Sequence, residues 1–318
     1  MTDLLFLRQR IGLVFLRLTT FLIGRCTHHK LQHTTFGDIL VRNIHLRIKL
    51  PVQTDRLDVT LLVTHTRCLD FEGLARPRYK DGSFKKEFDV LQTHGEGFIE
   101  GNSWNFSFHV PHDVFGVMEQ MGGEKEFLCK LDELFAMHLP EKYYEKNEDI
   151  TSDCLIGGYV HGNEPSHHIP YLYAWTSQPW KTQYWVREVM NRMYRNHIRG
   201  LSGNDDCGQM SAWYLFTAMG FYPVCPGTDQ YVLGAPYLPY MKLSLANGQS
   251  LEIKALGVSD KNRYVKAVLL NGKPYTKTYI THEDIVGGGT LEFVMSAKPN
   301  KKRGLSSSDK PYSLTNGK

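Results

Sequence analysis

The middle of the chain has the hydrophobic spacing of short amphipathic helices. Apolar residues recur every three or four positions, which is the period of a helix with one buried face. The spacing predicts helices over residues 114–121, 127–135, 180–193 and 207–219. Asp113 precedes the first of them as a capping residue. The last is apolar nearly all round, so we expect an inner, buried helix.

The pattern changes near Tyr237, where apolar and polar residues begin to alternate with a period of two. Asn-Gly pairs at 247–248 and 271–272 are typical of tight hairpin turns. The alternation predicts strands over residues 241–245, 251–253, 264–270, 275–280 and 290–295. Because helices come first and strands follow, we predict a mainly α protein with a C-terminal antiparallel β module.

This change of pattern divides the chain into four parts. Residues 75–236 are expected to form the helical domain, residues 237–300 the β module and residues 301–318 a polar, loose tail. Residues 1–74 mix Leu, Thr, His and Arg without sustained periodicity, and much of the excess basic charge lies there. We expect this unrecognised, aberrant N-terminal segment to lack a compact core of its own.

Composition and charge exclude several classes of protein. Of the 318 residues, 42% are hydrophobic, so the chain can bury a core. A net charge of +4 is too slight and too local to indicate nucleic-acid binding. No run reaches the roughly 18 uninterrupted apolar residues of a membrane span. The apolar stretch at 11–24 has no clear cleavage site for export. The six scattered cysteines are expected to be mostly free and buried.

The most informative chemistry lies at the start of the last predicted helix. Asp205 and Asp206 stand side by side in a glycine-containing loop that runs directly into that helix. Glycine lets a backbone approach a ligand closely, and the positive end of a helix favours ionised acids. Such a pair can hold a water, a metal ion or a sugar hydroxyl, or it can simply cap the helix. Cys207 is a poor nucleophile, because adjacent carboxylates disfavour its thiolate.

Two upstream segments carry similar polar groups. Glu100 and Trp104 flank a Gly-Asn-Ser sequence followed by alternating aromatic and polar residues. This suits the wall of a sugar site, although a partly buried strand fits the pattern too. Residues 161–168 read His-Gly-Asn-Glu-Pro-Ser-His-His, which is otherwise an exposed loop. Zinc is weakly indicated there, because adjacent histidines face apart and no common zinc-ligand spacing occurs.

Together these motifs resemble glycoside hydrolase family 92, the calcium-dependent exo-α-mannosidases. The matching segments, in the family's order, are residues 100–104 with 110–113, residues 162–168, and residues 203–214 continuing through 220–227. The resemblance runs from about Arg76 to about Lys298 and leaves out the first seventy-odd residues. It implies the C-terminal part of the family's catalytic region, with residues 75–236 as an incomplete (α/α)6 toroid.

The resemblance also implies an inverting hydrolysis of terminal α-linked mannose from glycans. It places Glu100 as the general acid and Asp206 as the general base that activates water. Family members often have a supporting acid two residues before the base, where this chain has Asn204. Asp205 is the alternative supporting carboxylate.

A Ca²⁺ ion is implied as the cofactor, bound by hard oxygen ligands and holding vicinal hydroxyls of mannose. Asn163 and Glu164 stand where the metal and sugar contacts are expected. The further candidates for sugar binding are Trp104, His161 and His167. The resemblance also suggests a periplasmic or secreted location.

Two other functions remain open from the sequence. The chain can be a non-catalytic carbohydrate-binding fragment, in which truncation removes turnover but leaves the sugar-facing loops. It can also be a structural domain whose acids only cap helices. An incomplete barrel would leave apolar faces exposed and favour association through them.

Overall fold

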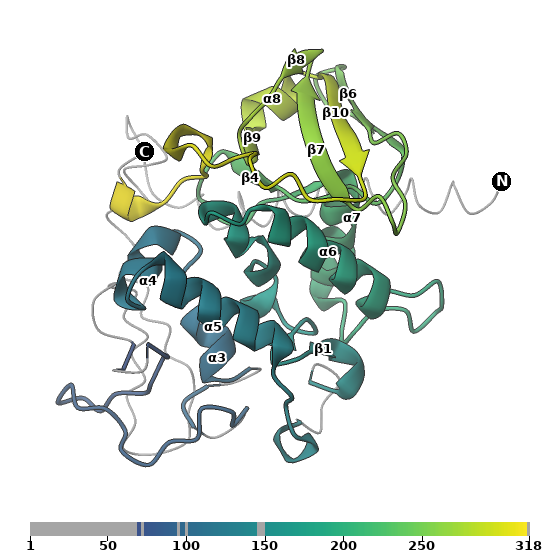
Figure 1. Cartoon of the computed structure of the whole chain (residues 1–318). Coiled ribbons are helices and arrows are strands. Elements are labelled where there is room, and N and C mark those ends of the chain that lie inside the picture. The colour runs from purple at the N-terminus through teal and green to yellow at the C-terminus, as the bar shows by residue number, and fades with distance from the viewer. Residues whose placement is uncertain (1–68, 71–72, 94–95, 99–100, 145–149, 317–318) are drawn as a thin grey trace, which may run out of the picture.

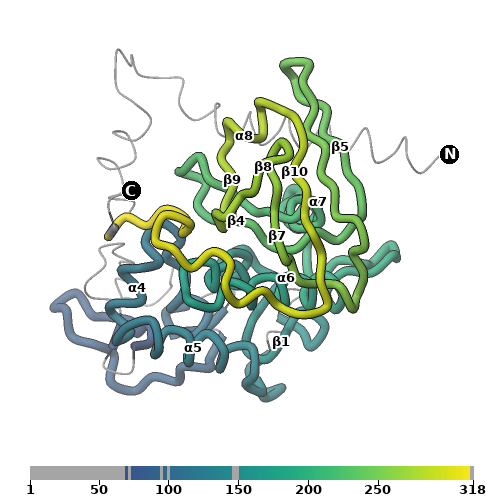
Figure 2. The backbone as a smooth tube through the Cα atoms, turned by 45° about the horizontal axis from the view of Figure 1, so that its top comes forward, coloured from purple at the N-terminus to yellow at the C-terminus, as the bar shows by residue number. Residues whose placement is uncertain are grey.

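The computed structural model describes residues 69–70, 73–93, 96–98, 101–144 and 150–316. Most of the helices lie in the lower half of Figure 1, and a β module lies above them. The C-terminal segment leaves the β module and runs back across the molecule to the helices (Figure 2). Within the described residues, no helix combines the length and the hydropathy that a membrane span requires.

The four predicted helices are confirmed. They are α4 (Val114–Gln120), α5 (Glu124–Ala136), α6 (Trp180–Met193) and α7 (Gln209–Met219). A shorter helix, α3 (Ser103–Ser107), precedes them. Much of the remaining backbone forms 3-10 turns: η1 (Glu141–Tyr143), η2 (Ser152–Cys154), η3 (Glu164–Ser166), η4 (Ile169–Trp175) and η5 (Asp206–Gly208).

The helices bury the faces that their periodicity indicates. Phe127, Leu131 and Leu134 of α5 are fully buried, and burial of one such side chain is worth about 1.5–3 kcal/mol. Helix α7 is buried on one face only, although its apolar sequence predicts burial nearly all round. Its Trp213 is fully buried, whereas residues 214–216 remain partly exposed despite being apolar.

A five-stranded sheet forms the main part of the β module, in the order β5-β6-β10-β7-β8. Its strands are β5 (Tyr240–Ser244), β6 (Ser250–Lys254), β7 (Tyr264–Leu270), β8 (Lys273–Pro274) and β10 (Gly289–Ser296). Most pairs are antiparallel, as expected, but β10 pairs parallel to β6. Between β8 and β10 the chain passes through β9 (Tyr279–Thr281) and helix α8 (His282–Val286). That connection lets β10 enter between β6 and β7.

The boundary expected at residue 236 does not separate two cores. Strands β3 (Phe221–Tyr222) and β4 (Gln230–Leu233) pair with β9 in a second, three-stranded sheet. Helical residues such as Trp213 and strand residues such as Phe293 belong to one hydrophobic cluster. The helical part and the β module therefore share a core.

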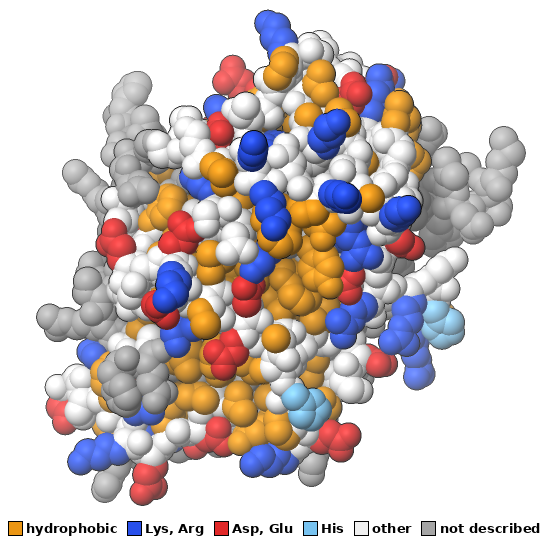
Figure 3. Space-filling view, viewed as in Figure 1, with side chains coloured by type: hydrophobic (Ala, Val, Ile, Leu, Met, Phe, Trp, Pro, Cys, Tyr) orange, Lys and Arg blue, Asp and Glu red, His pale blue; other side chains and the backbone are white. Residues whose placement is uncertain are grey.

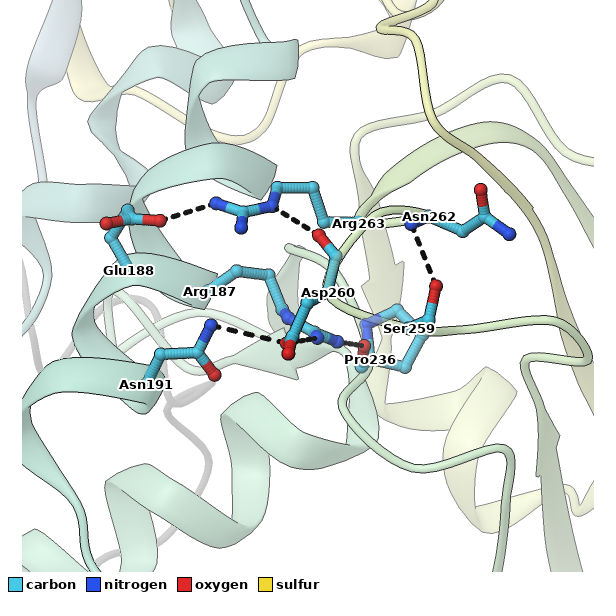
Figure 4. A network of polar contacts seen from close by, with 8 residues as sticks. All are labelled: Arg187, Glu188, Asn191, Pro236, Ser259, Asp260, Asn262 and Arg263. Carbon is cyan, nitrogen blue, oxygen red and sulfur yellow. Dashed lines mark hydrogen bonds and ion pairs between the residues drawn. The ribbon is translucent and has the colours of Figure 1, made fainter.

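A polar network also fastens α6 to the β module (Figure 4). The buried Arg187 donates from Nη1 to the Pro236 carbonyl at 2.9 Å and forms an ion pair with Asp260 at 3.4 Å. Its guanidinium also lies 4.4 Å from the centre of the Tyr237 ring. Because burial disfavours the charged form, the pKa of Arg187 falls below its usual value despite these partners.

The C-terminal segment is packed rather than loose, which corrects the expectation for residues 301–318. Ser313 is buried, and its hydroxyl donates to Asp113 Oδ1 at 2.6 Å. The Thr315 amide donates to the same oxygen at 2.9 Å. Trp175 donates from its indole nitrogen to the Tyr312 carbonyl at 3.0 Å. Polar composition suggested a free tail, but these polar groups satisfy one buried carboxylate.

The predicted N-terminal boundary also needs correction. Leu74 is buried in the main cluster, and Leu69 forms an antiparallel bridge with Ala75. Arg76 forms an ion pair with the buried Asp70 at 3.0 Å. These residues on both sides of position 74 therefore belong to one packed unit. The predictions for residues 1–68 lie outside the described residues.

We predict that the C-terminal segment contributes measurably to stability through Asp113. Burial alone would raise the pKa of Asp113, but hydrogen bonds from Ser313, Thr315 and Gly116 lower it below its usual value. Ser313→Ala should reduce the free energy of unfolding by about 1–3 kcal/mol, because it removes a buried bond to a charged group. The measurement is equilibrium denaturant unfolding at pH 7.

The matched control is Ser308→Ala, since Ser308 is exposed and, among the described residues, its hydroxyl bonds only to that of Ser306, at 2.9 Å. It should change stability by less than about 0.5 kcal/mol. Because the pKa of Asp113 is lowered on folding, its contribution is present above the unfolded pKa and is lost as pH falls through the folded one. Equal losses for the two variants would show that the Ser313 contact is unimportant.

Candidate active site

Two loops that are distant in sequence meet at the start of α7. The first follows the hairpin of β1 (Leu155–Ile156) and β2 (Tyr159–Val160) and spans residues 161–168. The second spans residues 200–208 and leads into α7. Glu100, the predicted general acid, lies outside the described residues.

The two adjacent acids have different structural roles. Asp205 Oδ1 accepts hydrogen bonds from the Ser211 amide and the Ser211 hydroxyl, each at 2.9 Å. These contacts satisfy a backbone donor in the first turn of α7, which is the work of a helix cap. The capping alternative raised by the sequence therefore applies to Asp205.

Asp206 instead occupies a strained turn and is exposed. Its φ is 44°, and the φ of Cys207 is 59°, so two successive non-glycine residues adopt the left-handed region. Such backbone costs of order 1–3 kcal/mol per residue and is concentrated at functional sites. The Asp206 carboxylate forms no hydrogen bond or ion pair with any residue that the structure describes. This turn separates a capping carboxylate from one that remains available.

His161 lies at the centre of a buried hydrogen-bonded chain. Tyr159 contacts His161 Nδ1 at 2.8 Å, and His161 Nε2 contacts the Tyr194 hydroxyl at 2.8 Å. Tyr194 donates its own proton to the Met210 carbonyl at 3.1 Å. Tyr194 therefore accepts from His161 Nε2–H, and Tyr159 donates to Nδ1. These hydrogen bonds connect His161 to Met210 in the first turn of α7.

His167 forms a second connection to α7. Its Nε2 lies 2.9 Å from the His161 carbonyl, which can only accept, so Nε2 carries the proton. Its Nδ1 then accepts from Gln209 Nε2 at 3.2 Å, and the same amide nitrogen donates to the Tyr222 hydroxyl at 3.1 Å. The indole nitrogen of Trp213 donates to the His167 carbonyl at 2.9 Å. These contacts hold the first loop against α7.

Both histidines are neutral. Burial lowers the pKa of His161 well below its usual value, and the nearby His167 lowers it further. Burial also lowers the pKa of His167 to about 4. In this structure neither ring offers a nitrogen to a sugar, because every ring nitrogen is used within the protein. Direct sugar contact by either residue would require this network to open, and it stays a prediction.

Asn163 and Glu164 contribute the oxygen donors expected of a calcium site. Asn163 is 2% exposed, and its side-chain oxygen accepts from the Glu164 amide at 3.0 Å. Glu164 is exposed. Burial raises the pKa of Tyr222 to about 12, the hydrogen bond from Gln209 opposes that rise, and the charge of Glu164 adds to it. Glu164 therefore acts on the tyrosine that also contacts Gln209.

These two residues fit a hard cation in their chemistry, since calcium binds carboxylate and amide oxygens. In the described part of the chain, no cluster of three or more His, Cys, Asp or Glu side chains is arranged to hold a metal ion. The described residues thus offer side-chain oxygens of the kind that calcium binds, but no cluster of acidic side chains that would enclose the ion.

Trp104 lies in the main core rather than on an open wall. It is 7% exposed, and the Lys130 ammonium lies 5.8 Å from the centre of its ring. Its predicted stacking on a sugar stays a prediction, and the described structure leaves little of the ring free. Its neighbour Asn105 connects α3 to β2 and to the 161–168 loop. Asn105 Oδ1 accepts from the Ser166 hydroxyl at 2.8 Å and the Val160 amide at 3.2 Å.

Sequence reasoning missed the residues that join the loops. They are Asn105, Tyr159, Tyr194, Gln209 and Tyr222. Gln209 had a usable signal, because it opens a helix directly after the acids and helical side chains point back toward the N-terminus. Tyr194 had none, since its partners lie 33 and 16 positions away in sequence.

We predict that His168 makes folding sensitive to mild acid. It is buried, and its Nε2 donates to the Phe108 carbonyl at 2.6 Å. Burial, followed by the nearby His109, lowers its pKa to about 3. A lowered histidine pKa gives stability that is present above the unfolded value of about 6.5 and is lost as pH falls toward the folded value. The loss between pH 7.5 and 5 should be about 2 kcal/mol.

The test compares denaturant unfolding of the wild type and His168→Gln at both pH values. Glutamine keeps an N–H donor for the Phe108 carbonyl but does not titrate. The variant should therefore lose about 2 kcal/mol less than the wild type over this interval. If both proteins lost the same stability, His168 would not be a source of the acid sensitivity.

The chain matches the glycosyl hydrolase family 92 catalytic domain over residues 62–297. This range begins inside the segment 1–74 that the sequence left unrecognised, so family resemblance starts earlier than expected. The motifs that meet at α7 all lie within it.

Three solved structures of two family GH92 mannosidases resemble this chain. A family GH92 α-mannosidase from Bacteroides thetaiotaomicron has a TM-score of 0.72 and 39% identity, covering 80% of this chain and 32% of its own. The same enzyme in complex with mannoimidazole gives a TM-score of 0.73 at 39% identity, covering 80% and 34%. A family GH92 inverting mannosidase from that species has a TM-score of 0.67 and 37% identity, covering 76% and 33%.

A curated relative from Arthroderma benhamiae, described as an uncharacterized secreted glycosidase, is 28% identical over 260 residues. The alignment covers 78% of this chain and 31% of that protein. The chain thus spans about a third of the length of the relatives that it matches. With most of its length matched to the catalytic domain, this chain belongs to glycosyl hydrolase family 92.

Proposed function

We propose that this chain carries part of the active site of an inverting, calcium-assisted α-mannosidase that removes terminal α-linked mannose from glycans. The observation that carries the proposal is the pairing of Asp205 and Asp206. One carboxylate caps α7, while its neighbour is exposed in a strained turn. One solved relative is described as an α-mannosidase and another as an inverting mannosidase, and these descriptions support the proposed substrate and mechanism.

In this proposal Asp206 is the general base. It removes a proton from the attacking water, and Glu100 protonates the leaving oxygen on the opposite side of the sugar. An inverting enzyme needs about 6.5–9.5 Å between the two carboxyl groups to admit that water. Asp205 acts by fixing the start of α7. The division of contacts favours it as a supporting residue rather than as a second base.

Asn163 and Glu164 would hold calcium through their side-chain oxygens. When bound, the ion supplies a fixed positive charge for vicinal sugar hydroxyls. The polypeptide positions these oxygens through the 161–168 loop, because His161 and His167 hold that loop against α7. A sugar bound there would lie close to the turn that carries Asp206.

We also propose that the helices belong to an (α/α)6 toroid in the longer proteins of the family. If the other helices of that toroid are needed to position the two carboxyl groups, the chain assayed alone would be weakly active, because misplacement by about 1 Å costs about a hundredfold in rate. Figure 3 shows hydrophobic side chains gathered over α6 and the adjoining end of β7. On the surface, Leu256 is 72% and Ile198 95% exposed. Apolar exposure of this kind favours association.

A non-catalytic carbohydrate-binding role is the second candidate. The contacts of His161 and His167 favour it, since they hold the 161–168 loop in place independently of any turnover. The secreted glycosidase among the relatives supports a secreted or periplasmic location for either function.

Replacing the two acids separately tests the proposed base. Asp206→Asn should lower kcat on an aryl α-mannoside by roughly a hundred- to ten-thousandfold, because it removes the proton acceptor. It should change stability little, since Asn tolerates left-handed backbone. Asp205→Ala should lower the free energy of unfolding by about 1 kcal/mol through loss of the cap. Both are measured with calcium present and again after chelation.

Each assay uses the chain alone and the chain joined to the upstream part of a related enzyme. Hydrolysis that is unaffected by Asp206→Asn in both contexts would overturn the proposed base. Calcium-dependent sugar binding without hydrolysis in either context would favour the second candidate. Full activity of the chain alone would show that the upstream part is dispensable.

The proposed acid has a distinct signature. Glu100→Gln should reduce turnover most for substrates with poor leaving groups, because good leaving groups need little protonation. Its affinity for mannoimidazole should stay within about twofold of the wild type. Rates are compared across aryl α-mannosides of graded leaving-group pKa. An equal loss for every leaving group would mean that Glu100 is not the general acid.

A further inference from the structure

The side-chain amide of Gln209 has only one orientation that satisfies its neighbours. The His161 carbonyl fixes the proton of His167 on Nε2, 2.9 Å away, so His167 Nδ1 must accept. Gln209 therefore presents its NH₂ group to Nδ1 at 3.2 Å, and the same nitrogen lies 3.1 Å from the Tyr222 hydroxyl. Both N–H groups of the amide are thus committed.

The amide oxygen of Gln209 is left without a donor. Within the described part of the chain it accepts no hydrogen bond. Gln209 is only partly buried, and its Oε1 is not one of the buried side-chain atoms that lack a partner. The oxygen is therefore accessible to solvent. A protein oxygen that is held in one direction and open to solvent is ready to accept a hydrogen bond from a ligand.

Gln209 also stands at the right place in the chain. It is the first residue of α7 and follows the strained turn of Asp206 and Cys207. Its amide contacts the 161–168 loop through His167, and Tyr222, its other partner, is influenced by the charge of Glu164. Gln209 therefore joins the two loops that carry the candidate base and the candidate calcium ligands.

We propose that Gln209 is a further substrate-binding residue, whose Oε1 accepts a hydrogen bond from a hydroxyl of the mannose bound beside Asp206. The proposal deepens the proposed function and rests on it. An acceptor that cannot rotate its amide selects for a donor hydroxyl at one position of the sugar. Gln209 thereby adds specificity for one sugar hydroxyl that neither acid provides, because the Asp205 oxygen caps α7 and Asp206 takes a proton from the attacking water.

The first test examines the amide orientation without using activity. Nitrogen-15 NMR of the histidine rings distinguishes which ring nitrogen carries the proton. The expected result for His167 at pH 7 is a proton on Nε2 and none on Nδ1. A proton on Nδ1 would mean that Gln209 turns its oxygen toward the ring, and the proposal would be wrong.

The second test measures mannoimidazole binding by calorimetry, with calcium present, for the full chain. Gln209→Leu should weaken binding by roughly five- to tenfold, as expected for one lost neutral hydrogen bond. Single-deoxy mannosides should identify the hydroxyl that donates to Gln209. The wild type should bind the sugar that lacks this hydroxyl more weakly than the parent mannoside, whereas Gln209→Leu should bind the two equally well.

A matched control separates binding from structural support. Gln230 of β4 accepts from the Tyr312 amide at 2.7 Å through its side-chain oxygen, away from the two loops in sequence. Gln230→Leu should lower Tm but leave mannoimidazole affinity unchanged. Gln209→Leu must lower affinity even at temperatures far below its Tm.

The outcomes distinguish the two proposals. If the wild type binds mannoimidazole and Gln209→Leu binds it equally well, Gln209 is only structural and the proposed function survives. If the wild type neither binds the probe nor hydrolyses an α-mannoside, the proposed function fails and the role of Gln209 fails with it. A loss of affinity in Gln209→Leu with no loss in Gln230→Leu supports both.

Discussion

One hydrogen bond determines the polarity of the candidate site: that between His167 Nε2 and the His161 carbonyl, at 2.9 Å. A carbonyl can only accept, so this contact decides which nitrogen of His167 is protonated. The tautomer in turn decides which way the Gln209 amide faces. The burial that keeps both rings neutral makes the arrangement stable, because a second ring proton would lack an acceptor in a low-dielectric interior.

This network explains why polar residues can be buried at the join between two loops. Tyr159, Tyr194 and Gln209 complete the hydrogen bonds of the two histidines, so burial leaves their ring nitrogens satisfied. The anchors lie on the first loop and on α7. The strained turn at residues 206–207 lies between α7 and the rest of the second loop. The strained residues therefore lie next to α7, whose Gln209 is held by His167. Fixed neighbours are what allow a costly backbone conformation to persist.

The sequence predicted those parts of the fold that depend on local pattern. Helices α4, α5, α6 and α7 follow from periodicity and from Asp113 as a cap. The parallel pairing of β6 and β10 and the joining of β3, β4 and β9 were missed, because strand order is a property of distant segments. The C-terminal segment was misjudged for the same reason. Ser313 looks like a loop residue until Asp113, 200 positions earlier, is placed beside it.

The candidate site shows the same limit more sharply. Residue type drew attention to the acids, but identical side chains at adjacent positions have different surroundings because the backbone turns between them. Asp205 Oδ1 accepts hydrogen bonds from Ser211 at the start of α7, whereas Asp206 has a left-handed backbone with a φ of 44°. His161 and His167, chosen as sugar contacts for their chemistry, hold the loop in this structure, and their contact with a sugar stays a prediction. The candidate chemistry depends on which polar atoms already have partners, and among the described residues the Asp206 carboxylate and the Gln209 amide oxygen accept no hydrogen bond.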